Sequence, residues 1–205
     1  MKKSKGMFWL FLGLLLIVAA LSLIAYNLYD ENHAKRSSEQ AVDRLNEYLN
    51  EASDLSSGVE KIPDYILNPE MEMPTKTING VDYIGVLQIP KLELELPVIR
   101  QWSYPHLKIA PCQYSGSVYL DTLVIAGHNY VSHFGNLKKL REGDVVLFTD
   151  MDGNTFRYTV VCWETLDSAA VEEMKNGDWD LTLFTCTIRG RNRVTVRCER
   201  EKAVG

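Results

Sequence analysis

The sequence lacks a clustered basic face, and it contains no internal repeat and no low-complexity tract. Acidic residues outnumber basic residues by 27 to 22, which gives a formal net charge of −5. Proteins that bind nucleic acid concentrate Lys and Arg on one surface in order to neutralise phosphates. The composition therefore argues against nucleic acid as a partner.

No charged residue occurs from position 6 to position 29, and Leu, Ile, Phe, Val and Ala dominate this stretch. It is long enough to span a bilayer as a helix. Lys2, Lys3 and Lys5 precede it and Asp30 and Glu31 follow it, which predicts a cytoplasmic amino terminus. The alternative is a cleaved signal peptide, but the run exceeds the usual core of about 7–15 residues and no small-x-small site closes it. We expect residues 1–29 to form a Lys-rich cytoplasmic tip and an uncleaved transmembrane anchor, with the rest of the chain outside the cell.

Residues 30–78 are expected to form a stalk between the anchor and a folded domain. A polar, helix-prone stretch at residues 41–49 is followed by the sequence SSG at 56–58 and by prolines at positions 63, 69 and 74. Val42, Leu45 and Leu49 follow helical spacing. Such a stripe packs on the domain or on a partner, or it belongs to a weakly amphipathic spacer, which is the interpretation that we favour.

Residues 79–205 are enough for one compact domain, and they read mainly as strands. Alternating or apolar runs predict strands at residues 83–89, 94–99, 123–126, 145–148, 156–161, 180–185 and 193–200. Asp152-Gly153 predicts a hairpin turn, because its surroundings lack the ligand series and closing Glu of a calcium-binding EF-hand. Residues 168–174 predict a short helix capped by Ser168. A small, mainly β domain follows, either a barrel or a sandwich, with no metal site.

Cysteine is scarce, and one cysteine has a notable position. Cys186 ends one predicted strand and Arg193 begins the next, while Gly190 and Asn192 between them fit an antiparallel connection. In a symmetric loop Cys186 faces Arg193, with Cβ atoms roughly 5 Å apart. A cation there favours the thiolate, the reactive form of cysteine, or holds an oxyanion formed by thiolate attack on a carbonyl.

Two alternatives to this reactive pair stay open. Cys186 is otherwise a buried strand cysteine beside a solvated arginine, since free cysteine is among the most buried residue types. A register slip of one residue would also turn Arg193 to the opposite face, and Arg191 or Arg197 would then have to be considered.

A thiolate nucleophile needs a proton donor for its leaving group, and the sequence has four histidines. His33 lies in the predicted stalk and His106 in a loop bounded by prolines. His128 directly follows a buried strand, and His133 comes five residues later. Gly127 permits close approach of the backbone, which favours His128 as the proton donor.

Residues 182–186 (TLFTC) match the TLxTC motif of the sortases, which are membrane-anchored cysteine transpeptidases of Gram-positive bacteria. Residues 123–128 (LVIAGH) resemble the segment with the catalytic histidine of that family, and residues 193–197 (RVTVR) resemble the strand that begins with its catalytic arginine. The similarity spans about residues 83–200. It implies a closed β-barrel, no cofactor, and a catalytic set of Cys186, His128 and Arg193.

The resemblance also implies a reaction. Cys186 would attack the Thr–Gly-type bond of an LPXTG-like sorting signal, and an amine would resolve the thioacyl enzyme. His128 would protonate the leaving amine and deprotonate the incoming one, while Arg193, with Thr185 as a further candidate, would stabilise the oxyanion. The product would be a surface protein or pilin joined to a peptidoglycan precursor, such as a lipid-linked one, or to a pilin lysine.

The subclass is open. The short connection after Cys186 matches neither the long loop of class A nor the continuation typical of class C. Residues 134–137 (FGNL) resemble class B, the strand pattern also resembles classes C to E, and residues 68–71 (NPEM) are not the Asp-Pro-aromatic plug of a class C lid. Arg189, Arg191, Arg197 and Arg200 compete with Arg193, which the family-like strand pattern favours.

Three further cysteines, Cys112, Cys162 and Cys198, accompany Cys186. Pairing of Cys162 with Cys198 is conceivable in an oxidising exterior, but it would leave Cys112 unpaired, and we expect core or loop thiols. Two other functional classes stay open. One is an extracellular thiol peptidase that passes the acyl group to water, and the other is an anchored binding module with no catalysis.

Overall fold

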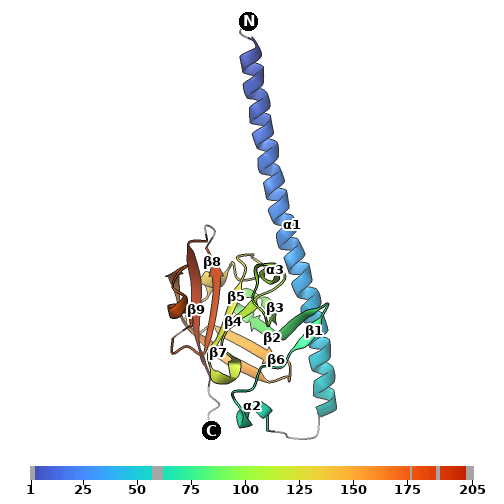
Figure 1. Cartoon of the computed structure of the whole chain (residues 1–205), viewed down its shortest axis with the longest axis vertical. Coiled ribbons are helices and arrows are strands. Elements are labelled where there is room, and N and C mark those ends of the chain that lie inside the picture. The colour runs from blue at the N-terminus through green and yellow to red at the C-terminus, as the bar shows by residue number, and fades with distance from the viewer. Residues whose placement is uncertain (1–2, 57–61, 176, 188–189, 202–205) are drawn as a thin grey trace.

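The computed structural model describes residues 3–56, 62–175, 177–187 and 190–201. A long helix, α1 (Lys3–Ser56), leads to a barrel, and its amino-terminal half extends beyond the barrel (Figure 1). The short helices are α2 (Asp64–Leu67), α3 (Tyr104–Leu107) and α4 (Val171–Lys175). The predicted mainly β fold with a closed barrel, short helices and an apolar amino-terminal helix is confirmed.

Eight strands close the barrel. They are β2 (Val81–Ile89), β3 (Leu94–Ile99), β4 (Cys112–Ser115), β5 (Leu123–Gly127), β6 (Val145–Asp150), β7 (Thr155–Asp167), β8 (Leu181–Cys186) and β9 (Asn192–Arg200). Their order is β2-β3-β4-β5-β8-β9-β7-β6, and β6 pairs with β2 to complete the ring. A short strand, β1 (Lys76–Ile78), pairs with the beginning of β2. The β3–β4 and β5–β8 pairs are parallel, and the other pairs are antiparallel.

The parallel strands β5 and β8 form the part of the wall that is buried on both faces. Leu123 and Leu183 point into the barrel core, while Val124 and Phe184 belong to a second apolar cluster on the outside. Parallel pairs that are covered on both faces read as continuous apolar runs, as these two segments do. The ends of β5 and β8 are therefore fixed by packing from two sides.

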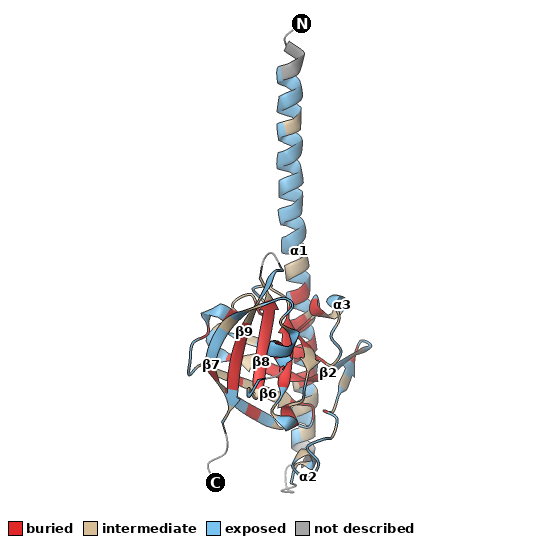
Figure 2. Cartoon of the chain, turned by 60° about the vertical axis from the view of Figure 1, so that its left-hand side comes forward, coloured by how far each residue is buried: buried red, intermediate tan, exposed pale blue. Residues whose placement is uncertain are grey.

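The second half of α1 packs against the barrel, so it is not the weakly amphipathic spacer that we favoured from the sequence. Ala41 and Leu45 are buried in the outer cluster, and Leu49 packs against it. Among the α1 residues whose burial is described, the buried ones lie where the helix runs beside the barrel (Figure 2). Arg44 and Asn46 add hydrogen bonds of 3.1 and 3.0 Å to the side chains of Asn79 and Glu95.

Several boundaries differ from the prediction. All seven predicted strands are present, but β7 continues to Asp167, and the short elements β1, β4, α2 and α3 were not predicted. Helix α4 begins at Val171, three residues after the predicted cap Ser168, and in the turn before it the carboxylate of Asp167 accepts a hydrogen bond from the backbone N–H of Ala169 (2.9 Å). The hairpin at Asp152-Gly153 is confirmed, and Gly153 has the positive φ of 84° that such a turn requires.

Some sequence-based expectations fall outside the described residues, namely those on Lys2, Ser57, Gly58 and Arg189. The boundaries 1–29, 30–78 and 79–205 stay predictions.

Candidate active site

Cys186 and Arg193 are direct partners in the antiparallel pair of β8 and β9. The predicted register is therefore confirmed. The backbone N–H of Thr187 donates to the carbonyl of Asn192 (2.9 Å), and Gly190 has a φ of 66°, which suits glycine in a tight turn. This connection places the thiol and the guanidinium side by side on the outer face at the rim.

The Arg193 side chain is only loosely held. Its Nη1 donates to the backbone carbonyls of Gly190 (3.0 Å) and Asn192 (3.4 Å), both in its own hairpin. Among the described residues no carboxylate forms an ion pair with it. A guanidinium has five N–H donors, so several of them stay available to an incoming group.

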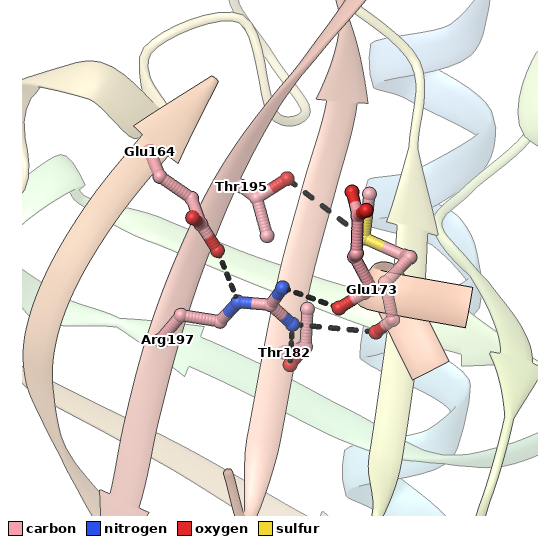
Figure 3. Close-up of polar contacts among 6 residues, drawn as sticks. Glu164, Glu173, Thr182, Thr195 and Arg197 are labelled. Carbon is pink, nitrogen blue, oxygen red and sulfur yellow. Dashed lines mark hydrogen bonds and ion pairs between the residues drawn. The ribbon is translucent and has the colours of Figure 1, made fainter. Parts of the chain in front are cut away.

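Two competing arginines are committed to structural contacts. The guanidinium of Arg197 is buried and donates to the side chains of Glu164 (2.8 Å) and Thr182 (3.0 Å) and to two carbonyls of α4, those of Glu173 and Met174 (Figure 3). Arg200 donates to Asp121 at 3.0 Å. The donors of Arg197 are thus occupied, and Arg200 lies at the opposite end of β9 from the pair of Cys186 and Arg193. Neither arginine is placed to meet a substrate at Cys186.

His128 directly follows Gly127, which is the parallel partner of Thr185. His128 therefore begins the loop at the same end of these two strands as Cys186. A Cβ at position 127 would come within 2.3 Å of the Phe134 ring, so a glycine is needed for this close packing. Burial lowers the pKa of the His128 imidazole, and the charge of Asp30 opposes that shift.

None of the other three histidines directly follows a strand of the barrel. His133 is fully buried, and burial lowers its pKa to about 4, so the ring is neutral. His106 lies in α3, where its Nδ1 is 2.7 Å from the carbonyl of Gln101. His33 lies on α1 with its ring 6.3 Å from that of Tyr29.

Thr185 is buried, and its hydroxyl has no hydrogen-bond partner among the described residues. It lies between Gly127 on β5 and Val194 on β9. A buried hydroxyl without a partner is costly unless a ligand or water supplies one. Thr185 also lines the polar groove described next.

Cys186 lies where two grooves meet. The apolar groove also contains Arg193 and has a volume of about 190 Å³; its apolar lining comes from Trp102, Tyr104, Leu107, Tyr114, Ala126, Ala170, Val171, Met174 and Phe184. The polar groove has a volume of about 630 Å³ and is lined by Asn129, Phe134, Gly135, Lys138, Thr185, Thr187, Arg191, Asn192 and Val194. The thiol can therefore contact one group on each side.

The sequence analysis missed the aromatic wall of the apolar groove. Trp102 and Tyr104 have ring centroids 5.2 Å apart, and Tyr114 meets Phe184 edge to face at 5.2 Å. Exposed aromatic residues in a loop are the signal that could have pointed to them.

Cys186 is the cysteine that lines the two grooves, and Cys112, Cys162 and Cys198 line neither of them. Cys112 and Cys198 are buried, which raises their thiol pKa, to about 12 for Cys112. Cys162 is exposed, whereas Cys198 points into the barrel core. All four cysteines are free thiols.

Known proteins share this fold. The family model described as a sortase domain matches residues 87–201. The chain is 26% identical to Sortase A of Bacillus anthracis over 193 residues, which cover 89% of each protein. Sortase C from Clostridium perfringens SM101 has a TM-score of 0.52 at 24% identity, with 88% of this chain and 99% of that chain covered. Sortase A from Corynebacterium diphtheriae has a TM-score of 0.54 at 20% identity, with 88% and 96% covered.

A closed barrel with a strand-end thiol beside an arginine is the architecture of a cysteine transpeptidase of the sortase kind. The chain belongs to the sortase family. The solved relatives include proteins named sortase A, sortase C and sortase D5 with similar TM-scores of 0.52–0.54, so they do not select a subclass.

Proposed function

We propose that the chain is a membrane-anchored transpeptidase that cleaves an LPXTG-like sorting signal through a thioacyl intermediate on Cys186. The observation that carries the proposal is the pairing of Cys186 with Arg193 where two grooves meet. A transpeptidase must hold an acyl donor and an amine acceptor on either side of one nucleophile, and two grooves satisfy that need.

In the first half of the reaction, His128 takes the proton of the Cys186 thiol, and the thiolate sulfur attacks the scissile carbonyl and forms the C–S bond. Arg193 donates to the oxyanion of the tetrahedral intermediate, with the unpartnered Thr185 hydroxyl as a second donor. The C–N bond then breaks, and His128 gives a proton to the departing amine.

In the second half, the acceptor amine gives a proton to His128 and attacks the thioester. The C–S bond breaks, and the thiolate is restored. Exclusion of water is essential here, because hydrolysis of the thioester would end the reaction as a peptidase.

The grooves suggest where each substrate binds. The aromatic lining around Trp102 and Tyr104 suits the apolar part of a sorting signal, and a Clostridium perfringens sortase C has been solved with a C-terminal cell wall sorting motif. The polar groove would hold the acceptor, an amine of a peptidoglycan precursor or of a pilin, and its cations Lys138 and Arg191 disfavour the protonated form of that amine, which is not nucleophilic. Surface proteins or pilins would be the donors.

Helix α1 is long and apolar enough to cross a membrane, and the large apolar residues from Met7 to Tyr29 are mostly exposed. Anchoring by residues 6–29, with a cytoplasmic amino terminus and an extracellular barrel, explains this exposure. It would hold the enzyme where surface proteins and lipid-linked precursors emerge.

The test is mass spectrometry of the full chain in detergent with a library of sorting-signal peptides and amines. We expect a thioacyl adduct on Cys186 that disappears on adding the amine, with the amide as product. Cys186→Ala should abolish the adduct, whereas Cys162→Ala, which removes another accessible thiol, should keep it. Hydrolysis alone with every amine would mean a thiol peptidase, and unchanged sorting by Cys186→Ala would mean a binding module.

A further inference from the structure

The loop that follows β5 is attached to α1 by two consecutive carboxylates. The hydroxyl of Tyr130 donates to Asp30 at 2.5 Å, and the backbone N–H of Val131 donates to Glu31 at 2.9 Å. Lys108 forms an ion pair with Asp30 at 3.3 Å. Asp30 is also the first charged residue after the apolar run of α1. The end of the predicted membrane span is therefore bound to the loop that carries His128.

Tyr130 connects this contact to the imidazole. Its ring stacks on that of His128, with centroids 3.9 Å apart and planes 12° from parallel. The Nδ1 atom of His128 is buried and has no hydrogen-bond partner among the described residues. A catalytic histidine is usually oriented by a hydrogen bond from its second ring nitrogen. In this chain the ring of Tyr130 stacks on the imidazole in place of such a hydrogen bond, and the carboxylate of Asp30 holds the Tyr130 hydroxyl.

We propose that Asp30, on the membrane-proximal part of α1, and Tyr130, on the loop after β5, are positioning residues that fix the His128 imidazole. Asp30 holds the Tyr130 hydroxyl, Tyr130 holds the His128 ring, and the anchor helix thereby becomes part of the support of the active site. The role of His128 rests on the proposed function, but the contact of Asp30 with Tyr130 and the stacking do not.

The charges around His128 make the arrangement measurable. Asp30 and Glu31 face the loop from α1, Lys108 faces it from the turn after α3, and Tyr130 and His133 lie on the loop itself. Burial has the largest effect on the pKa of His128 and lowers it. The charge of Asp30 raises this pKa, and the charge of Lys108 lowers it further. Loss of the Asp30 charge should therefore move the titration to lower pH, and loss of the Lys108 charge should move it to higher pH.

The experiment uses the full chain in detergent with ¹³Cε1-labelled histidine, and the His128 resonance is assigned from its loss in His128→Gln. We expect Asp30→Asn to shift the titration midpoint down and Lys108→Gln to shift it up. Glu39→Gln removes an equal charge from α1 at an exposed site that pairs with Lys35, and it should leave the midpoint unchanged.

Turnover of the peptide found in the mass-spectrometric screen gives a second measurement. Tyr130→Phe keeps the stacking ring and loses the hydroxyl, so kcat should fall about tenfold with little change in KM, and Tyr130→Ala should lose more. Thermal unfolding identifies any variant that has lost its fold. Equal midpoints in wild type, Asp30→Asn and Lys108→Gln, or an equal shift in Glu39→Gln, would overturn the inference. Absence of turnover by the wild type would instead refute the proposed function, and the titration would still test the contact.

Discussion

Arg193 and Arg197 lie four residues apart on β9, on the same outer face of the barrel, and their surroundings differ. Arg193 is at the rim, and among the described residues its side chain donates to two carbonyls of its own hairpin. Arg197 is 3% exposed and bridges Glu164, Thr182 and the last turn of α4. Strand β9 therefore carries two different cations. Arg193 keeps donors available at the rim, whereas the donors of Arg197 are used in contacts within the fold.

The difference arises because α4 packs over Thr195 and Arg197, whereas the hydrogen bonds of Arg193 among the described residues stay within its own hairpin. Arg197 holds this helix by its carbonyls, and Met174 of α4 both lines the apolar groove and meets the Thr195 hydroxyl at 3.8 Å (Figure 3). A buried charge is tolerated only where it is paired and hydrogen-bonded, a condition met at Arg197. The buried arginine thus shapes the groove beside the exposed arginine.

The largest expected effect is that of Arg197→Met on stability. Methionine fills much of the volume, but it leaves the carbonyls of Glu173 and Met174 and the Thr182 hydroxyl without their donor. We expect a loss of about 3–5 kcal/mol in the free energy of unfolding. Urea unfolding measures it, with Arg157→Gln as control, because Arg157 forms an exposed pair with Glu201 and should change stability by less than about 1 kcal/mol. Equal effects in the two variants would contradict the comparison.

Arg193→Ala should show the opposite pattern. Removal of an oxyanion donor is expected to lower kcat/KM by about 10²–10³-fold, while the unfolding free energy changes by no more than about 0.5 kcal/mol. Arg193→Lys should restore little, because an ammonium lacks the planar set of donors. Steady-state kinetics and urea unfolding of the same samples check both parts. Stability lost in parallel with activity would assign Arg193 to the fold rather than to the reaction.

The sequence was sufficient to predict those features of the fold and of the candidate site that depend on a local pattern of residues. The strand at residues 94–99 was predicted with its exact bounds, and the symmetric loop gave the pairing of Cys186 with Arg193. Gly127 pointed to a close approach, which the Phe134 ring makes. Each of these follows from alternation, turn chemistry or backbone freedom within a few residues.

Features that depend on distant segments could not be predicted. Alternation along β9 gave Thr195 and Arg197 a polar, solvent-facing side, yet both are buried because α4 folds over them. β4 has only four residues and takes its form from pairing with β5 and with Ile99. Asp30 and Tyr130 are 100 positions apart, and no local pattern links them.

The smallest expected effect tests whether the ion pair or the hydrogen-bond set holds Arg197. Glu164 is 42% exposed, so Glu164→Gln keeps an acceptor for the Arg197 guanidinium and removes only a charge that water partly screens. We expect a loss of less than about 1 kcal/mol in the free energy of unfolding, because partly exposed pairs contribute little. Unfolding at low and high salt separates the two terms: the difference between wild type and Glu164→Gln should shrink with salt, whereas that between wild type and Arg197→Met should persist. A loss in Glu164→Gln as large as in Arg197→Met would mean that the charge pair, rather than the carbonyls of α4, keeps the arginine in the wall of the groove.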